Sequence, residues 1–176
     1  MNPWHDVEIG TNAPEVINAI IEAPKHSTLK YEMDKKTGML LLDRALYSAV
    51  YYPGNYGFVP QTYWEDQDPL DIIILGNQPI YPLTIVHARP IGVLRMQDNG
   101  ESDDKIIAVI NDDPRFEEVT DISDVSKHIR KELKHFFETY KQLQGKSVVI
   151  LEELGAQEAK QTVKKSIALY NQEFKQ

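Results

Sequence analysis

Four carboxylates lie within the seven residues Glu65–Asp71 (EDQDPLD), and the apolar segment Ile72–Leu75 follows directly. Neighbouring carboxylates repel one another unless cations or protons neutralise them, so this density predicts a divalent metal site. Pro69 disfavours a helical backbone at Asp68, and we therefore expect Asp66 and Asp68 to be extended and to point to one side. Asp71 stands at the start of a predicted strand. Ligands that are all oxygen suit Mg²⁺, Mn²⁺ or Ca²⁺.

Two other interpretations of this stretch compete with the metal site. Charge runs usually face water, so a solvated acidic loop is one alternative. The other is a calcium loop of the EF-hand type, which needs Gly at its sixth position and Glu at its twelfth. Counted from Asp66, those positions hold Asp71 and Asn77, and Leu70 occupies the fifth, which needs an oxygen ligand. The EF-hand interpretation therefore fails, while the solvated loop stays open.

A second group of carboxylates lies between two apolar runs, Gly92–Met96 and Lys105–Ile110. The runs predict a β-hairpin. Its polar tip carries four carboxylates, those of Asp98, Glu101, Asp103 and Asp104. Taken alone, this tip favours a solvated loop over a metal site. Lys105 closes the tip where the second strand begins.

Basic residues are expected to gather on another hairpin. The segment Leu29–Met33 alternates, which places Lys30 and Glu32 on one face. After a turn, Met39–Leu42 returns as the partner strand and leads to Arg44, so Lys30, Glu32 and Arg44 would lie close together. An ordinary cross-strand ion pair also explains these residues in isolation.

The segment Tyr51–Phe58 (YYPGNYGF) combines aromatic residues with glycine, proline and asparagine. Glycine permits tight backbone turns, and phenolic hydroxyls can bond an anion. Aromatic side chains usually belong to the core. This interleaving is less typical of a plain strand, so some of the hydroxyls are expected to face a cleft.

The remaining pattern predicts a mainly β protein with two helices. Short segments punctuated by Pro79, Pro82 and Pro90 favour a barrel over a long open sheet. The other predicted strands are Val16–Glu22, Thr84–Ala88 and Ser147–Leu151. An amphipathic helix is predicted over Asp124–Leu143, capped by Ser123 or Asp124, and a second over Ala156–Phe174.

Composition limits the class of protein. The 176 residues are expected to form one domain, 1–176, and the absence of cysteine excludes disulfides, thiolate zinc sites and cysteine nucleophiles. No apolar run approaches the ~20 residues that span a bilayer. The polar, acidic start Met1–Gly10 lacks the features of a signal peptide, so a cytoplasmic location is expected. A net charge of -8 argues against a general nucleic-acid binder, and an anionic substrate would need locally gathered basic residues and metal ions.

Together these residues resemble the family I soluble inorganic pyrophosphatases of the prokaryotic type. The family signature DxDPxD is present as Asp66–Asp71 and precedes an apolar strand. Other blocks follow in the family's order: Ile21-Glu22, Lys30-Tyr31-Glu32, Asp43-Arg44, Tyr52–Gly57, Asp98, Asp103–Lys105, and His135–Phe137 with Tyr140-Lys141. The match runs from Ile21 to Ile150. Leu151–Leu154 departs from the Gly-Trp of many members, and Asn99 stands where some have Glu and is left unassigned.

The resemblance implies an α+β, mainly β fold: a five-stranded, OB-like closed β-barrel with the two main helices packed outside. It implies Mg²⁺-dependent hydrolysis of pyrophosphate to two orthophosphates by a metal-activated water, with several Mg²⁺ ions per site. It also implies a homo-oligomer, commonly a hexamer. No nucleic-acid or membrane partner is expected.

Roles carried over by position divide the site into groups. Direct metal ligands would be Asp66, Asp71, Asp98 and Asp103, and Asp68 is the candidate general base. Substrate phosphate oxygens would be held by Lys30, Arg44, Tyr56, Tyr140 and Lys141. Supporting residues would be Glu22 and Glu32, acting through water or on a further ion, together with Tyr52 and Lys105.

Two other functions are weighed against this one. A Mg²⁺-dependent hydrolase of longer polyphosphates or nucleotides is disfavoured, because the sequence has no GxxxxGK[ST] loop. A non-enzymatic OB-type module that binds nucleic acid or calcium is the other alternative.

Overall fold

The structure is a computed structural model in which residues 1–175 are described. A short helix, α1 (Pro3–Asp6), precedes the strands β1 (Ile17–Ala23), β2 (Leu29–Met33), β3 (Leu40–Ala45), β4 (Asn55–Phe58), β5 (Asp71–Leu75), β6 (Ile85–Asp98), β7 (Glu101–Ser102) and β8 (Lys105–Ile110). Two 3-10 turns, η1 (Pro114–Phe116) and η2 (Ile122–Asp124), lead to α2 (Lys127–Thr139), η3 (Gln142–Gln144), β9 (Val148–Gly155) and α3 (Ala156–Phe174). The predicted α+β, mainly β class is confirmed.

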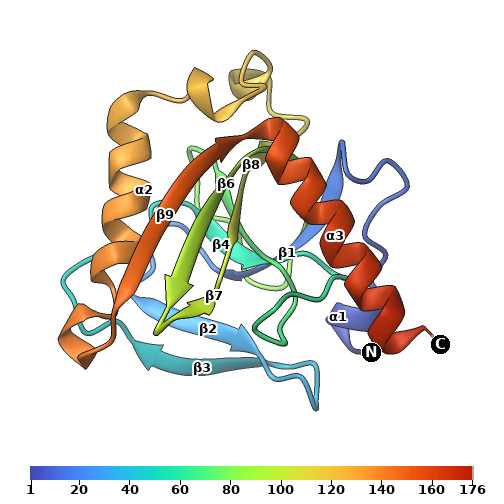
Figure 1. Cartoon of the computed structure of the whole chain (residues 1–176), viewed down its shortest axis with the longest axis horizontal. Helices are drawn as coiled ribbons and strands as arrows, with labels where there is room; N and C mark the ends of the chain where they lie inside the picture. The colour runs from blue at the N-terminus through green and yellow to red at the C-terminus, as the bar shows by residue number, and fades with distance from the viewer. Residues whose placement is uncertain (176) are drawn as a thin grey trace.

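Strand pairing in the main sheet returns to its starting strand. β1 pairs with β4, β4 with β5, β5 with β8, β8 with β6, and β6 with β1. Only the β5–β8 pair in this ring is parallel. β7 and β9 extend β6, and β2 with β3 forms a separate two-stranded sheet. Figure 1 shows α2 and α3 on different sides of the strands, with the β2–β3 hairpin below them.

Side chains of β5 alternate between two buried clusters, as a period of two requires. Ile73 packs in a cluster with Phe136 and Phe137 of α2. Ile72 and Ile74 pack in the other, which includes Val163 of α3. A strand buried on both faces is a rigid base for the residue at its start, Asp71.

The predicted strands Thr84–Ala88 and Gly92–Met96 are one continuous strand, β6, so the prediction of a break at Pro90 was wrong. The pairing register of β6 with β8 shifts between Pro90 and Gly92. Proline lacks a backbone donor, and such an irregularity lets a strand accommodate it. A Cβ added at Gly92 would lie 2.8 Å from Cβ of Ile122, so this position also needs glycine for close packing.

The helix predicted over Asp124–Leu143 is shorter and begins later. Asp124 is not its cap, because its carboxylate accepts from the backbone of Thr120 and Asp121 at 2.9 Å. Ser126 caps α2 instead. Leu143, the last residue of the predicted helix, lies beyond α2 in η3 and is exposed. The second predicted helix coincides with α3.

Among residues 1–175, no helix is long and apolar enough to cross a membrane.

Candidate metal and phosphate site

The acidic loop is a turn, and the prediction of an extended backbone was wrong. Gln67 has a φ of 66°, in the left-handed region, and Oδ1 of Asp66 accepts from the backbone nitrogen of Asp68 at 3.2 Å. Proline at position 69 restricts only the residue before it, so Gln67 was free to turn. Asp66 and Asp68 nevertheless both line one cavity, although only Asp66 belongs to the group of converging carboxylates.

Three carboxylates converge beside this turn. One oxygen from each of Asp66, Asp71 and Asp103 lies within 4.8 Å of the other two. Register explains the convergence, because Asp71 on β5 pairs with Lys105 on the parallel strand β8, and Asp103 lies two residues before Lys105. Three oxygen ligands around one point suit a hard cation such as Mg²⁺, Mn²⁺ or Ca²⁺.

Lys105 lies between two of these carboxylates. Its side chain is 2% exposed, and its ammonium pairs with Asp71 and, at 2.5 Å, with Asp103. Burial acts to lower the pKa of Lys105, but the two carboxylates raise it well above its usual range. The ammonium therefore stays charged and balances part of the negative cluster.

The three carboxyl groups differ in acidity. Burial, with Asp71 and Asp103 nearby, raises the pKa of Asp66 to about 7. Burial also raises the pKa of Asp71, against the opposing effect of Lys105. For Asp103 the ammonium of Lys105 outweighs burial and lowers the pKa. Near neutral pH the cluster therefore retains a proton that a bound cation would displace.

A cavity of about 400 Å³ opens beside the cluster. Its volume lies within the range of small-molecule sites. Most of the predicted site residues line it: Lys30, Tyr56, Asp66, Asp68, Asp71, Asp98, Asp103, Lys105, Tyr140 and Lys141. A neighbouring cavity of about 240 Å³ shares Lys30, Tyr56, Asp68 and Asp71 and adds Glu22 and Glu32. The two carboxylate clusters and the basic hairpin thus meet in one place.

The basic residues of the hairpin are held by Asp43. Lys30 lies opposite Arg44 in the β2–β3 register, and Oδ2 of Asp43 contacts both cations. Lys30 also pairs with Glu32 on its own strand at 2.6 Å, and its contact with Asp43 at 3.3 Å is the cross-strand ion pair. Nε and Nη2 of Arg44 are buried without a hydrogen-bond partner, which leaves donors for an anion. Arg44 itself does not line either cavity.

A second pair joins the hairpin tip to the end of α2. The ammonium of Lys141 pairs with Asp98, whose other oxygen, Oδ1, is buried without a partner. Burial lowers the pKa of Lys141 despite this contact. A buried carboxylate oxygen without a partner can accept a further donor or bind a metal ion.

Tyr56 and Tyr140 contribute hydroxyls to the cavity wall. Burial raises the pKa of both, so they remain protonated donors at neutral pH. Tyr52 lies behind them, with its ring 5.3 Å from Tyr56 and 4.8 Å from Phe136, and it lines neither cavity. Tyr52 therefore packs against the cavity wall from behind, as expected of a supporting residue.

Glu22 is a buried carboxyl at the end of β1, only 7% exposed. It accepts a hydrogen bond from the backbone nitrogen of Met33 at 2.7 Å. Burial nevertheless raises its pKa to about 8, so the group is largely protonated at neutral pH.

Sequence reasoning missed two residues and overestimated a third. Lys35 pairs with Asp68, and Asp43 holds Lys30 and Arg44. Lys35 had no local signal beyond its place on the hairpin, whereas Asp43 belongs to the Asp43-Arg44 block but was given no role of its own. Asp104 was grouped with the second cluster, but it is buried away from the site in an ion pair with Arg95.

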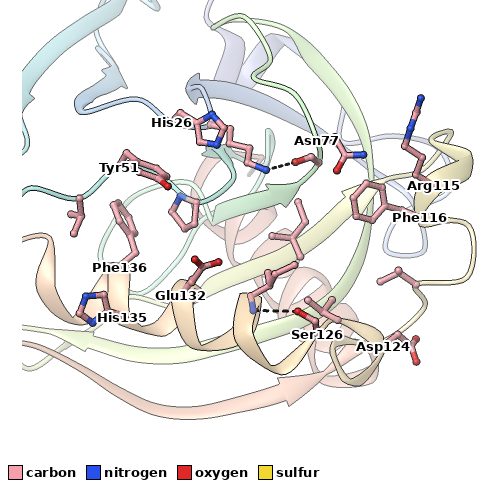
Figure 2. Close-up of a pocket in the computed structure, with 18 of the residues that line it drawn as sticks. His26, Tyr51, Asn77, Arg115, Phe116, Asp124, Ser126, Glu132, His135 and Phe136 are labelled. Atoms are coloured by element: carbon pink, nitrogen blue, oxygen red, sulfur yellow. Dashed lines mark hydrogen bonds between the residues drawn. The ribbon is translucent and has the colours of Figure 1, made fainter.

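A different cavity of about 530 Å³ lies against α2 (Figure 2). Figure 2 shows His26, Tyr51, Phe116 and Phe136 around it, with His135 and Glu132 on the helix. Its walls are largely apolar, and Tyr51 and Ile129 on its rim are 55% and 42% exposed. Walls of this kind suit a highly charged phosphate poorly.

Comparisons of the sequence and of the fold with known proteins all identify one family. A family model described as "Inorganic pyrophosphatase" matches residues 19–171. The chain is 49% identical over 173 residues to "Soluble inorganic pyrophosphatase 2" of Chlamydomonas reinhardtii, covering 98% of this chain and 90% of that protein. A relative from Zea mays is 49% identical over 171 residues, covering 97% and 80%. The solved inorganic pyrophosphatase of Thermus thermophilus superposes with a TM-score of 0.94 at 40% identity, covering 97% and 99% of the two chains.

Proposed function

Because the chain belongs to the inorganic pyrophosphatase family, we propose that Asp66, Asp71 and Asp103 bind the metal and that the adjoining cavity holds pyrophosphate. The family predicted from the motifs is confirmed. The activity is hydrolysis of inorganic pyrophosphate to two orthophosphates. The observation that carries the proposal is the convergence of three carboxylates beside a cavity that also contains basic residues.

The metal is Mg²⁺, with several ions per site. Bound at these carboxylates, Mg²⁺ would neutralise phosphate charge and would make the attacking water more acidic. Asp98 is the fourth direct ligand, supported by its unpaired Oδ1. Glu22 and Glu32 line the neighbouring cavity and act through water or on a further ion.

The phosphate oxygens contact Lys30, Arg44, Tyr56, Tyr140 and Lys141. Pyrophosphate carries several negative charges, and cations with oriented hydroxyls stabilise the charge that develops on the leaving phosphate. The two unpaired donors of Arg44 support its role. Their use requires the side chain to reach the cavity when substrate enters, since Arg44 does not line it otherwise.

Asp68 is the general base. Its carboxylate stands apart from the three-carboxylate cluster but lines both cavities, so it can accept a proton from an attacking water. Lys105 and Tyr52 support the site: Lys105 holds Asp71 and Asp103 together, and Tyr52 packs behind Tyr56.

The five-strand ring is an OB-like closed barrel, and residues 1–176 form one domain around it. Support comes from the closed path of strand pairing through β1, β4, β5, β8 and β6. The complete absence of cysteine is in keeping with a cytoplasmic location. Cell fractionation tests that location.

The chain is a homo-oligomer, a hexamer by family analogy. Exposed apolar side chains rimming a cavity mark interaction surfaces. The cavity against α2 (Figure 2) supports assembly through that face. Two apolar residues that line it, Tyr51 and Ile129, are exposed.

A phosphate-release assay with pyrophosphate, ATP and tripolyphosphate, each with Mg²⁺ or with EDTA, tests the function. We expect release from pyrophosphate with Mg²⁺ and loss of release in EDTA. Faster release from ATP or tripolyphosphate would favour the alternative hydrolase. No release from any of the three would favour a binding module.

A further inference from the structure

Lys35 connects the turn between β2 and β3 to the acidic loop. Its ammonium forms an ion pair with Asp68 and donates to the backbone oxygen of Gln67 at 3.3 Å. Gln67 has a φ of 66°, a backbone conformation that residues other than glycine rarely adopt. Lys35 therefore contacts both the carboxylate of Asp68 and the peptide group that precedes it.

The turn that carries Lys35 is itself fixed by the N-terminal segment. Nδ2 of Asn2 donates to the backbone oxygen of Lys35 at 3.0 Å. The ammonium of Lys35 lies 5.8 Å from the ring centroid of Trp4, within the range of a cation–π contact. At Gly38 a Cβ would lie 2.8 Å from the backbone oxygen of Met1, so the two segments approach closely.

The same N-terminal segment contacts the chain that leads into the acidic loop. Nε1 of Trp4 donates to the backbone oxygen of Thr62 at 2.8 Å. Thr62 in turn accepts at Oγ1 from the backbone nitrogen of Leu70, at 2.9 Å. Trp4 thus contacts Lys35 and also Thr62, and Thr62 precedes the acidic loop and is hydrogen-bonded to Leu70 near its end. Residues 1–18 lie outside the match to the family model.

We propose that Lys35 is a positioning residue for Asp68, braced by Asn2 and Trp4. This rests on the proposed role of Asp68 as general base. The ion pair draws the Asp68 carboxylate toward the hairpin and away from the three-carboxylate cluster, so that it remains available to a water in the cavity. Because the side chains of Lys35 and Asp68 are 51% and 47% exposed, water screens their attraction, and the effect on rate is modest.

The test compares Lys35→Met with Lys36→Met and Lys35→Arg in the full chain at saturating Mg²⁺. Lys36 is the exposed neighbour on the same turn and serves as the matched control. We expect Lys35→Met to lower kcat about three- to tenfold, the scale of a lost surface pair or a small misplacement, with KM within about twofold. Lys35→Arg should restore at least half of kcat, and Lys36→Met should resemble the wild type. Mg²⁺ affinity by calorimetry should change less than about twofold.

A double-mutant cycle identifies the path of the effect. If Lys35 acts through Asp68, adding Lys35→Met to Asp68→Asn should cause no further loss. Additive losses would overturn the proposal. A raised KM at unchanged kcat would instead place Lys35 on the phosphate, and an unchanged kcat and KM would reduce the contact to a surface ion pair.

Two further measurements keep the test decisive. If Lys35→Met does not fold, as judged by thermal unfolding, Trp4→Phe replaces it. That variant keeps a ring near the ammonium but removes the donor to Thr62, and a lower kcat with unchanged KM is the expected result. A wild type that releases no phosphate from pyrophosphate would refute the proposed function. If the wild type is active and its variants have unchanged kcat and KM, only the positioning role is refuted.

Discussion

Asp71 and Lys105 lie opposite each other at the start of two parallel strands, and the buried ammonium of Lys105 contacts the carboxylate of Asp71 directly. The same ammonium contacts Asp103 at 2.5 Å. One cation therefore holds together two of the three carboxylates assigned to the metal. The arrangement brings like charges into contact range before any metal binds, and it makes the metal-free site dependent on Lys105.

Lys105→Met should destabilise the protein most when metal is absent. Removing one member of a buried ion pair costs about 3–5 kcal/mol, because the other charges remain without a partner. Protonation of Asp66, whose pKa is about 7, should reduce that loss near neutral pH. Added Mg²⁺ should recover part of it by binding the folded state. Denaturant unfolding in EDTA and in Mg²⁺ measures both effects. Equal losses in the two conditions would contradict the counter-ion role.

Mg²⁺ affinity should fall as pH decreases through 7. Asp66 has a pKa of about 7, and its carboxylate must lose a proton to bind metal. Below that value the affinity should drop by about tenfold per pH unit for the one competing proton. Calorimetric titrations at pH 6, 7 and 8 test this, with Asp66→Asn as the variant expected to bind weakly with a flatter pH dependence. The same affinity at all three values would show that metal binding displaces no proton from Asp66 over this range.

The sequence predicted which residues come together better than it predicted the backbone that carries them. The DxDPxD signature and the apolar strand after it located Asp66 and Asp71 correctly beside one cavity. The backbone of the loop was missed, because the rule for residues before proline says nothing about Gln67, whose left-handed φ depends on contacts with distant segments. Local patterns do not report such contacts.

The same limit explains the errors in the elements. Pro90 marks a break only if nothing compensates for its missing donor, and the shift in pairing with β8 compensates here. Asp124 is a good helix cap by residue type, but its carboxylate already accepts hydrogen bonds from the backbone nitrogens of Thr120 and Asp121. In both cases the deciding interaction involves a neighbour that periodicity does not identify.

Glu22 should make stability depend on pH. Its folded pKa is raised to about 8, so the folded protein holds a proton that the unfolded chain releases near 4.5. The resulting stability is fully present below pH 4.5 and is lost as pH rises through 8. Glu22→Gln has no such proton to lose. Its free energy of unfolding relative to the wild type should therefore increase between pH 4.5 and 8, by on the order of a few kcal/mol. Denaturant unfolding in EDTA at pH 6, 7, 8 and 9 measures the difference, and a constant difference would contradict it.

Disrupting the apolar rim of the cavity against α2 should weaken assembly without removing the catalytic groups. Ile129→Asp places a charge on an exposed apolar position, and burying it at a contact would be costly. Sedimentation velocity should show smaller species than for the wild type. Lys131→Asp, on an exposed position of the same helix outside that cavity's wall, is the control. If Ile129→Asp leaves the oligomer intact, the face assigned to assembly is wrong.

Asp68 and Asp71 belong to one motif but have different proposed roles, and their asparagine variants should respond differently to Mg²⁺. Asp71→Asn should lower metal affinity, and raised Mg²⁺ should restore part of the activity by mass action. Asp68→Asn removes a general base, a loss of about 10²–10⁴ in rate that extra Mg²⁺ cannot replace. Higher pH should help Asp68→Asn by supplying hydroxide directly. Turnover and metal titrations for both variants across Mg²⁺ and pH make the comparison. If Mg²⁺ rescues Asp68→Asn as well as Asp71→Asn, Asp68 is another ligand, and the proton of the attacking water must leave by a route that needs no protein base.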